Sequence, residues 1–324
     1  MSRSASRTSA GSPDGPSGSA DARRRDPGVG KPSTARIWLL AARPRTLPAA
    51  VAPVLVGTAL AASEGAFSIP ILVAALLGAL FIQIGTNLSN DYSDARRGAD
   101  TEDRLGPVRV TAGGLVPPRQ VLRATWVAFG LAVLAGSYLI AVTGWELLLA
   151  GVASILAGVL YTGGPRPYGY AGLGEIFVFL FFGLVAVAGS YFAQTERLSA
   201  EALMLAIPVG LLASAILVVN NVRDLETDRR ANKKTLAVRL GRSRTRLLYV
   251  AMIAGAYLTV TLPWLFGDLG PAVLISWVSL RLALPMVRIV RTRTDGPTLN
   301  RALAGTGSLQ LVFCLLLAAG VQAG

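Results

Sequence analysis

The sequence has no histidine and a single cysteine, Cys314, and only 15% of its 324 residues are charged. The first absence excludes imidazole as a catalytic base or metal ligand, and the second excludes an intrachain disulfide. Any chemistry therefore depends on carboxylate, amide, hydroxyl and phenol groups, a set that suits Mg²⁺ rather than zinc. Cys314 itself lies in the last apolar run, where we interpret it as a small buried hydrophobe.

Charged residues are scarce because long apolar runs fill the chain. Hydrophobic residues make up 52% of the sequence, and the mean hydropathy is +0.53. Most of the uncharged runs approach the roughly 20 residues that a spanning helix needs. They cover residues 47–63, 65–90, 124–145, 147–165, 176–195, 202–222, 247–267, 269–280 and 302–324. The sequence therefore predicts an all-α, polytopic membrane protein of about nine transmembrane helices, the eighth of which must continue past Arg281 to reach a full span.

The basic residues predict how this protein is oriented. Segment 93–119 carries five Lys or Arg residues and segment 222–246 carries nine, whereas the loops that alternate with them, 63–69, 142–145, 193–201 and 265–269, hold only Arg197. The positive-inside rule then places the basic segments and the N-terminus in the cytoplasm. The expected location is the plasma membrane, which the chain crosses several times. This topology accounts for the net charge of +13 without a nucleic-acid partner.

The N-terminal segment differs in composition from the rest. Residues 1–35 are rich in Ser, Ala, Gly, Pro, Asp and Arg, which predicts a disordered cytoplasmic tail. It is not interpreted as a signal peptide, because the first apolar run starts too far in and leads into further spans. Residues 36–324 are predicted to form one transmembrane domain.

Two short polar stretches interrupt the apolar sequence. Helical spacing puts Asn87, Asn90, Asp91 and Asp94 on one face, and Asn220, Asp224 and Asp228 on another. Each stretch ends an even-numbered predicted helix, the second and the sixth, and is followed by a basic loop. This quasi-repeat predicts two half-sites that face one central cavity open to the cytoplasmic side.

The chemistry of these stretches suits a metal and a phosphate. Carboxylates one turn apart can coordinate Mg²⁺ while the ion takes further oxygens from a diphosphate, which makes Asp91, Asp94, Asp224 and Asp228 candidate metal ligands. The amides of the same helix ends can add neutral ligands or donate to phosphate. We assign phosphate neutralisation to Arg109, Arg223 and Lys234. Capped helix ends and mutual surface salt bridges are the alternative readings, although exposed ion pairs contribute little.

Two further sites have open interpretations. Arg43, in the run Arg43-Pro-Arg45-Thr46 near the start of the first helix, either binds an anionic substrate or is an interfacial positive charge. Tyr161 is either an interfacial aromatic residue or part of the site.

Several motifs together resemble the UbiA superfamily of intramembrane prenyltransferases, and most closely its 1,4-dihydroxy-2-naphthoate branch. The resemblance covers residues 36–324 and is carried by the two polar stretches and four other segments. These are Arg43 to Leu47, Gly106 to Gly114, Tyr161 through Tyr168 to Glu175, and Lys234 to Gly241. The superfamily's commoner first motif has a third aspartate where this chain has Gly98, and Asp100 comes two residues later, so a role for Asp100 is not assigned.

The resemblance implies a reaction and its participants. A polyprenyl group moves from an allylic polyprenyl diphosphate to 1,4-dihydroxy-2-naphthoate, which loses its carboxylate to give demethylmenaquinone, and Mg²⁺ assists ionisation of the diphosphate. It implies catalytic roles for Asp91, Asp94, Asp224, Asp228 and Tyr161. Tyr161 would either steady the allyl cation through its ring face or orient the acceptor through its hydroxyl. It implies that substrate is bound by Asn87, Asn90, Asn220, Arg43, Arg109, Arg223 and Lys234.

Three alternatives remain to be tested. A prenyltransferase of the same fold could act on another aromatic acceptor such as 4-hydroxybenzoate. A transporter would need polar residues near mid-membrane, whereas these carboxylates lie at helix ends. A CDP-alcohol phosphotransferase also has an aspartate-rich helix, but Asp94-Ala95-Arg96 does not reproduce its motif.

Overall fold

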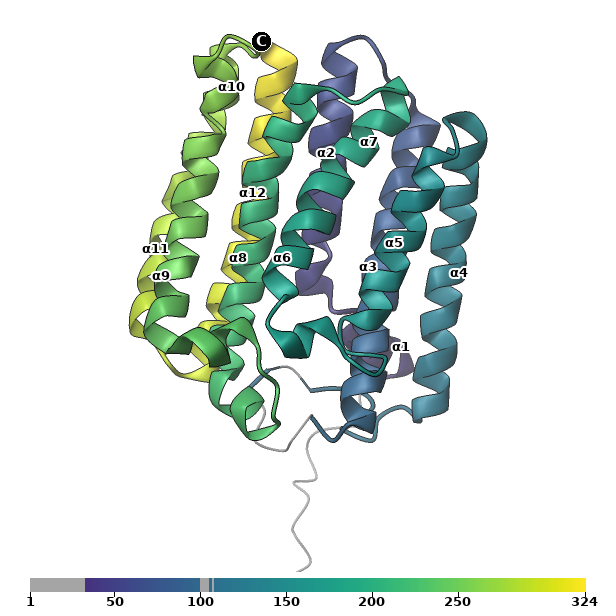
Figure 1. Ribbon diagram of the computed structural model, residues 1–324, viewed down its shortest axis with the longest axis vertical. Coiled ribbons are helices and arrows are strands. Elements are labelled where there is room, and N and C mark those ends of the chain that lie inside the picture. Colours follow the sequence, from purple (N-terminus) through teal and green to yellow (C-terminus); the bar gives the residue numbers. More distant parts are fainter. Residues whose placement is uncertain (1–32, 100–104, 107) are drawn as a thin grey trace, which may run out of the picture. The chain divides into compact units, whose positions relative to one another are not determined.

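Long helices stand side by side and connect two ends of the domain (Figure 1). The computed structural model describes residues 33–99, 105–106 and 108–324, and in these ranges it contains helices and no strands. Residues 34–324 form one compact unit. Most of the predicted tail, residues 1–32, and Asp100 lie outside the described residues.

The first half of the domain contains a broken helix and three unbroken ones, and the helices of the second half are interrupted more often. The first-half elements are α1 (Thr34–Ala42), η1 (Pro44–Thr46), α2 (Pro48–Ser63), α3 (Ile69–Arg96), α4 (Pro118–Val142) and α5 (Glu146–Leu160). The remaining elements are η2 (Tyr168–Ala171), α6 (Gly174–Val178), the π-helix η3 (Phe179–Val185), α7 (Ala186–Thr195), α8 (Ala200–Arg230), α9 (Leu236–Thr259), α10 (Leu262–Leu265), η4 (Pro271–Ser279), α11 (Leu280–Thr292) and α12 (Gly296–Ala323).

The prediction of a polytopic helical membrane protein is confirmed, but the count of nine spans is not. Within the described chain, seven helices are long and apolar enough to cross a membrane, or eight if α1 and α2, bent by 51°, form one span. The fourth predicted run, 147–165, yields only the 15 residues of α5. Its last residues include Gly163, Gly164 and Pro165, which leave the helix and form a loop at the polar end.

Helix α8 lies at the centre of the bundle. Of its most apolar 18-residue window, 72% is buried, against 22% for α3 and α4, which face the surroundings more. The π-helix η3 crosses α8 where two glycines meet. A Cβ on Gly183 would lie 2.7 Å from the Cα of Gly210, so the two backbones touch there and only glycine fits.

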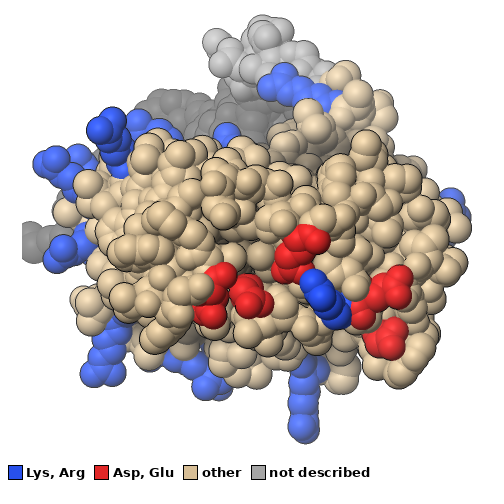
Figure 2. Space-filling model, turned by 90° about the horizontal axis from the view of Figure 1, so that it is seen from above, with Lys and Arg blue, Asp and Glu red and all other residues tan. Residues whose placement is uncertain are grey.

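The two ends of the domain differ in charge. Loops that join the helices at the C-terminal end carry Glu64, Glu146, Glu196 and Asp268, and Figure 2, which views this end, shows acidic side chains gathered on it. The basic segments 93–119 and 222–246 include the loops at the opposite end. This asymmetry is what the positive-inside rule requires, and the orientation in the membrane stays a prediction.

Candidate active site

A cavity of about 460 Å³ lies among α2, α3, α4, α5, α7 and α8. Both polar helix ends reach it, that of α3 through Asp94 and that of α8 through Asp224 and Asp228. Of the twelve predicted site residues, nine line the cavity: Arg43, Asn87, Asn90, Asp94, Arg109, Tyr161, Asn220, Asp224 and Asp228. The two clusters, 126 or more residues apart in sequence, therefore share one space.

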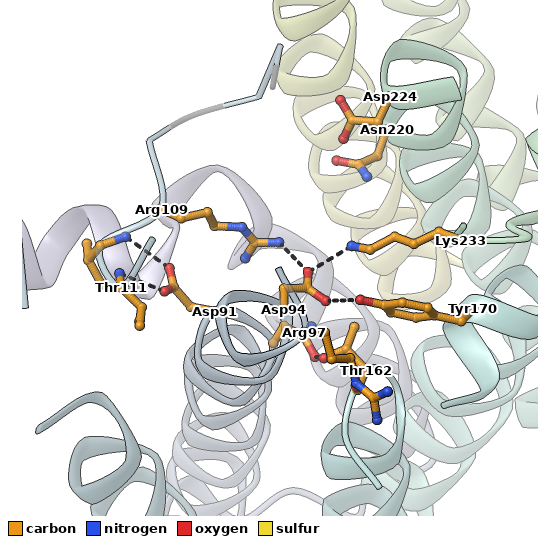
Figure 3. Close-up of polar contacts among 12 residues, drawn as sticks. Asp91, Asp94, Arg97, Arg109, Thr111, Thr162, Tyr170, Asn220, Asp224 and Lys233 are labelled. Carbon is orange, nitrogen blue, oxygen red and sulfur yellow. Dashed lines mark hydrogen bonds and ion pairs between the residues drawn. The ribbon is translucent and has the colours of Figure 1, made fainter. Parts of the chain in front are cut away.

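Asp94 is the centre of the polar network (Figure 3). Its carboxylate, 1% exposed, lies 3.2 Å from Arg109 Nη2 and 3.1 Å from Lys233 Nζ, and it accepts a 2.8 Å hydrogen bond from the Tyr170 hydroxyl. Lys233 Nζ also lies 4.9 Å from the centre of the Tyr170 ring, on its face. Three segments of the chain thus meet on one carboxylate, and two of them bring positive charge.

The other polar residues at the end of α3 each hold a different segment. Asn87 donates through Nδ2 to the carbonyl of Ala42 at 3.0 Å and to Thr46 Oγ1 at 3.1 Å. These bonds fix the break between α1 and α2, where Arg43 adopts a left-handed conformation with φ 55° and lines the cavity. Asn90 accepts a 2.9 Å bond from the Thr162 hydroxyl in the loop after α5.

Asp91 has contacts that differ from those expected of a metal ligand. Its carboxylate accepts the backbone N–H groups of Val110, at 3.1 Å, and Thr111, at 2.9 Å, and does not line the cavity (Figure 3). The reason is helix geometry. At about 100° per residue, the four polar positions of the α3 end span roughly 100° of the helix surface, and Asp91 lies at one edge of that arc, where the loop is closer than the cavity.

The end of α8 is organised by a buried arginine. Arg223, 3% exposed, binds Asp224 through Nε at 2.7 Å and Nη2 at 2.5 Å, and donates 2.7 Å bonds to Asn220 and Asn300. It does not line the cavity. Arg223 was predicted to bind phosphate. Its contacts show that it neutralises and orients Asp224 from outside the cavity.

Two lysines follow α8, and the structure places the unexpected one in the site. Lys233 is buried and lines the cavity, whereas Lys234 is exposed and only its backbone N–H reaches the loop, donating to the Tyr170 carbonyl at 3.1 Å. The left-handed conformation of Asn232, φ 55°, turns the chain just before them. Tyr170 was missed as well, although it lies within the motif that runs from Tyr161 to Glu175.

An aromatic series lines the cavity beside the polar end. The Tyr161 and Tyr168 rings meet edge to face at 5.4 Å, and Tyr168 stacks on Phe177 at 3.9 Å. The Tyr161 hydroxyl is a possible hydrogen-bond donor among these rings.

The rest of the cavity is apolar and extends between α4, α5 and α7. One wall is a row of residues spaced by four along the segment from α6 through η3 to α7: Phe177, Phe181, Val185, Gly189 and Ala193. The cavity thus has a charged end and a long apolar part, which suits a ligand with an anionic head and a hydrocarbon tail.

The donor set fits Mg²⁺ only in combination with a ligand. In the described chain, no three Asp, Glu, His or Cys side chains converge closely enough to hold a metal by themselves. Asp94, Asp224 and Asp228 nevertheless line one cavity. This fits an ion that takes one or two carboxylates and completes its shell with water and diphosphate oxygens.

The fold and the site define a class: a multi-pass membrane enzyme with a cavity for an amphiphilic anionic substrate. Residues 50–319 match the model of the UbiA prenyltransferase family, and the chain belongs to that family. It is therefore a prenyltransferase, as the resemblance of its motifs implied.

Relatives of known activity cover nearly the whole chain. It is 42% identical over 292 residues to the 1,4-dihydroxy-2-naphthoate octaprenyltransferase of Mycobacterium tuberculosis. The aligned region covers 89% of this chain and 97% of that enzyme. The enzyme of the same name from Escherichia coli is 38% identical, with 87% and 95% covered. Among solved structures, a UbiA homolog from Archaeoglobus fulgidus bound to GPP and Mg²⁺ superposes with a TM-score of 0.66 at 18% identity, covering 89% of this chain and all of that one.

Proposed function

We propose that this protein transfers a polyprenyl group from an allylic polyprenyl diphosphate to 1,4-dihydroxy-2-naphthoate, with Mg²⁺ as cofactor, in menaquinone biosynthesis. The observation that carries the proposal is the cavity in which the polar ends of α3 and α8 meet beside an apolar channel. The names of relatives about 40% identical over most of the chain support the choice of acceptor. We further propose that the protein lies in the plasma membrane and that its site opens to the cytoplasm. The reason is that the basic loops lie at the same end of the domain as the site.

The diphosphate belongs at the charged end of the cavity. Arg109 and Lys233 point there and are nine-tenths buried, so their charges are little screened by solvent. As the C–O bond of the donor breaks, its electron pair leaves with the diphosphate, and these two cations stabilise the growing negative charge. Asp94, Asp224 and Asp228 would hold Mg²⁺ together with the diphosphate, and the ion would add charge neutralisation for the leaving group.

The prenyl group and the acceptor belong next to the charged end of the cavity, toward its apolar part. The tail fits the apolar part of the cavity along Phe177, Phe181 and Val185, which excludes water from the allyl cation. The Tyr161 ring faces the cavity close to the polar end and can stabilise that cation. The acceptor ring forms the new C–C bond and loses its carboxylate as CO₂, and we assign Arg43 to binding that carboxylate before it leaves.

The test is an acceptor screen with one fixed donor, repeated with donors of several chain lengths. Purified protein in detergent, with Mg²⁺ and one polyprenyl diphosphate, is incubated with 1,4-dihydroxy-2-naphthoate or with 4-hydroxybenzoate, and the lipid extract is separated by chromatography. We expect prenylated product from the naphthoate and none when Mg²⁺ is chelated. Product from 4-hydroxybenzoate alone would assign the chain to another branch of the family, and no product with either acceptor at any donor chain length would reject the proposal.

A further inference from the structure

Asp91 is a buried carboxylate that the proposed reaction does not use. It is 2% exposed, and its two oxygens each accept a backbone N–H, one from Val110 and one from Thr111. A carboxylate that accepts two such bonds holds the donating backbone firmly, because bonds to a charged acceptor are about twice as strong as neutral ones. Its partners belong to a loop 19 and 20 residues further along the chain.

That loop is folded rather than extended. The carbonyl of Val110 accepts the N–H groups of Leu115 at 2.9 Å and Val116 at 3.1 Å, which closes the segment into a compact turn. The Val110 side chain is fully buried in a small apolar cluster with Ala41 and Leu88. Asp91 and this cluster therefore fix Val110 from two directions, through its N–H and through its side chain.

Arg109 immediately precedes this fixed residue. Its guanidinium lies 3.2 Å from Asp94, lines the cavity and is 9% exposed as a residue. Because the peptide between Arg109 and Val110 carries the N–H that Asp91 binds, the position of that carboxylate sets the direction in which Arg109 enters the cavity.

We propose that Asp91 is a positioning residue, which aims Arg109 at the donor diphosphate, and is not a ligand of Mg²⁺. The inference rests on the proposed function, since it assumes that Arg109 stabilises the leaving group. It separates the two aspartates of the α3 end by role: Asp94 faces the cavity and the metal, and Asp91 faces the loop.

The experiment is a double-mutant cycle with a metal titration. Asp91→Ala, Arg109→Ala and the double variant are compared for kcat and KM of the polyprenyl diphosphate and for the Mg²⁺ concentration that gives half-maximal rate. We expect each single change to lower kcat/KM by about 10- to 100-fold, as misplacement of a catalytic group does. The double variant should be no worse than Arg109→Ala, and the Mg²⁺ requirement of Asp91→Ala should stay within about twofold of wild type.

Asp295→Asn is the matched control. Asp295 also accepts a backbone N–H, from Thr298 at 2.9 Å, but it caps α12 outside the cavity, and asparagine caps a helix equally well. This variant should keep wild-type rates. Asp94→Ala provides the contrast, because loss of a metal-facing carboxylate should raise the Mg²⁺ requirement at least tenfold.

Hydrogen exchange supplies a readout that needs no turnover. Asp91→Ala should speed amide exchange in residues 108–116, whereas Arg109→Ala should leave it unchanged, because the bonds described above, from Val110 and Thr111 to Asp91 and from Leu115 and Val116 to Val110, do not use the side chain of residue 109. The inference would be overturned if the losses of kcat/KM in the two single variants multiplied in the double variant. A raised Mg²⁺ requirement or unchanged amide exchange in Asp91→Ala would overturn it as well. Failure of the wild type to form prenylated product would instead reject the proposed function, and exchange would still decide the role of Asp91.

Discussion

Replacing Asp94 with alanine removes the carboxylate that two buried cations contact. Arg109 and Lys233 are each 9% exposed, so water replaces little of the lost interaction. Removing one partner of a buried ion pair typically costs about 3 to 5 kcal/mol, and we expect Asp94→Ala to lower the free energy of unfolding by that amount. The Tyr170 hydroxyl loses its acceptor as well, which adds about 1 kcal/mol.

The single cysteine provides the assay. Cys314 is fully buried in α12, so a thiol-reactive dye labels it only when the protein unfolds, and labelling in detergent against temperature or denaturant reports stability. Inorganic pyrophosphate without Mg²⁺ should then stabilise Asp94→Ala more than wild type, because it restores a negative charge beside both cations. At 100 times its dissociation constant a bound ligand contributes about 2.7 kcal/mol.

Glu64→Gln is the control for this prediction. Glu64 pairs with Arg197 at 2.5 Å at the opposite end, where the side chains are 26% and 65% exposed. Glu64 also accepts a 2.8 Å bond from the buried Tyr191 hydroxyl, which the amide oxygen of glutamine can keep. Loss of the exposed ion pair alone should cost no more than about 1 kcal/mol. Pyrophosphate should not affect this variant beyond its effect on wild type. If Asp94→Ala were no less stable than Glu64→Gln, or if pyrophosphate stabilised it no more than wild type, the view of Asp94 as the neutralising centre would be refuted.

Steady-state kinetics can compare the neighbouring lysines. Lys233→Ala, which removes the buried charge, should lower kcat/KM for the donor by about 100-fold. Lys234→Ala, which removes an exposed charge, should leave that kcat/KM within about twofold of wild type. Arg43→Ala should raise the acceptor KM more than the donor KM, and Asn87→Ala should do the same more weakly because it holds the turn that carries Arg43; the reverse pattern would argue against a carboxylate contact. Asp228→Ala should nearly abolish turnover while leaving the folded protein intact by Cys314 labelling, and near-normal activity at limiting Mg²⁺ would exclude it as a metal ligand.

Sequence patterns alone predict the helices and the meeting of two polar helix ends that lie far apart in the sequence. Apolar runs with charges only at their ends predicted the helices, and the repeated order of a polar helix end followed by a basic loop predicted that the ends of α3 and α8 share a cavity. The helices are predictable because the cost of burying charge and the period of 3.6 residues act along a single helix. The shared cavity is predictable because the same order of segments occurs in both halves of the chain.

The roles of individual side chains were harder to predict. Asp91 and Arg223 lie on the expected helices, but Asp91 turns to a loop and Arg223 turns back to Asp224, because each meets a partner closer than the cavity. Lys233 and Lys234 are adjacent and chemically equal, and only the turn at Asn232 decides which one enters the site. The spacing of residues in the sequence predicts which side of a helix they share. It does not predict which partner each side chain meets, because that depends on the path of the loops outside the helices.

The π-helix η3 has a consequence for the shape of the hydrocarbon channel. In a regular α-helix, residues spaced by four drift around the axis by about 40° at each step, so a five-member row would wind away from a straight ligand. The wider turn of Phe179–Val185 counteracts that drift and helps positions 177 to 193 keep to the same wall. Deleting one residue within this turn should restore ordinary winding, twist the far half of the wall outward, and shorten the longest isoprenoid that the enzyme accepts.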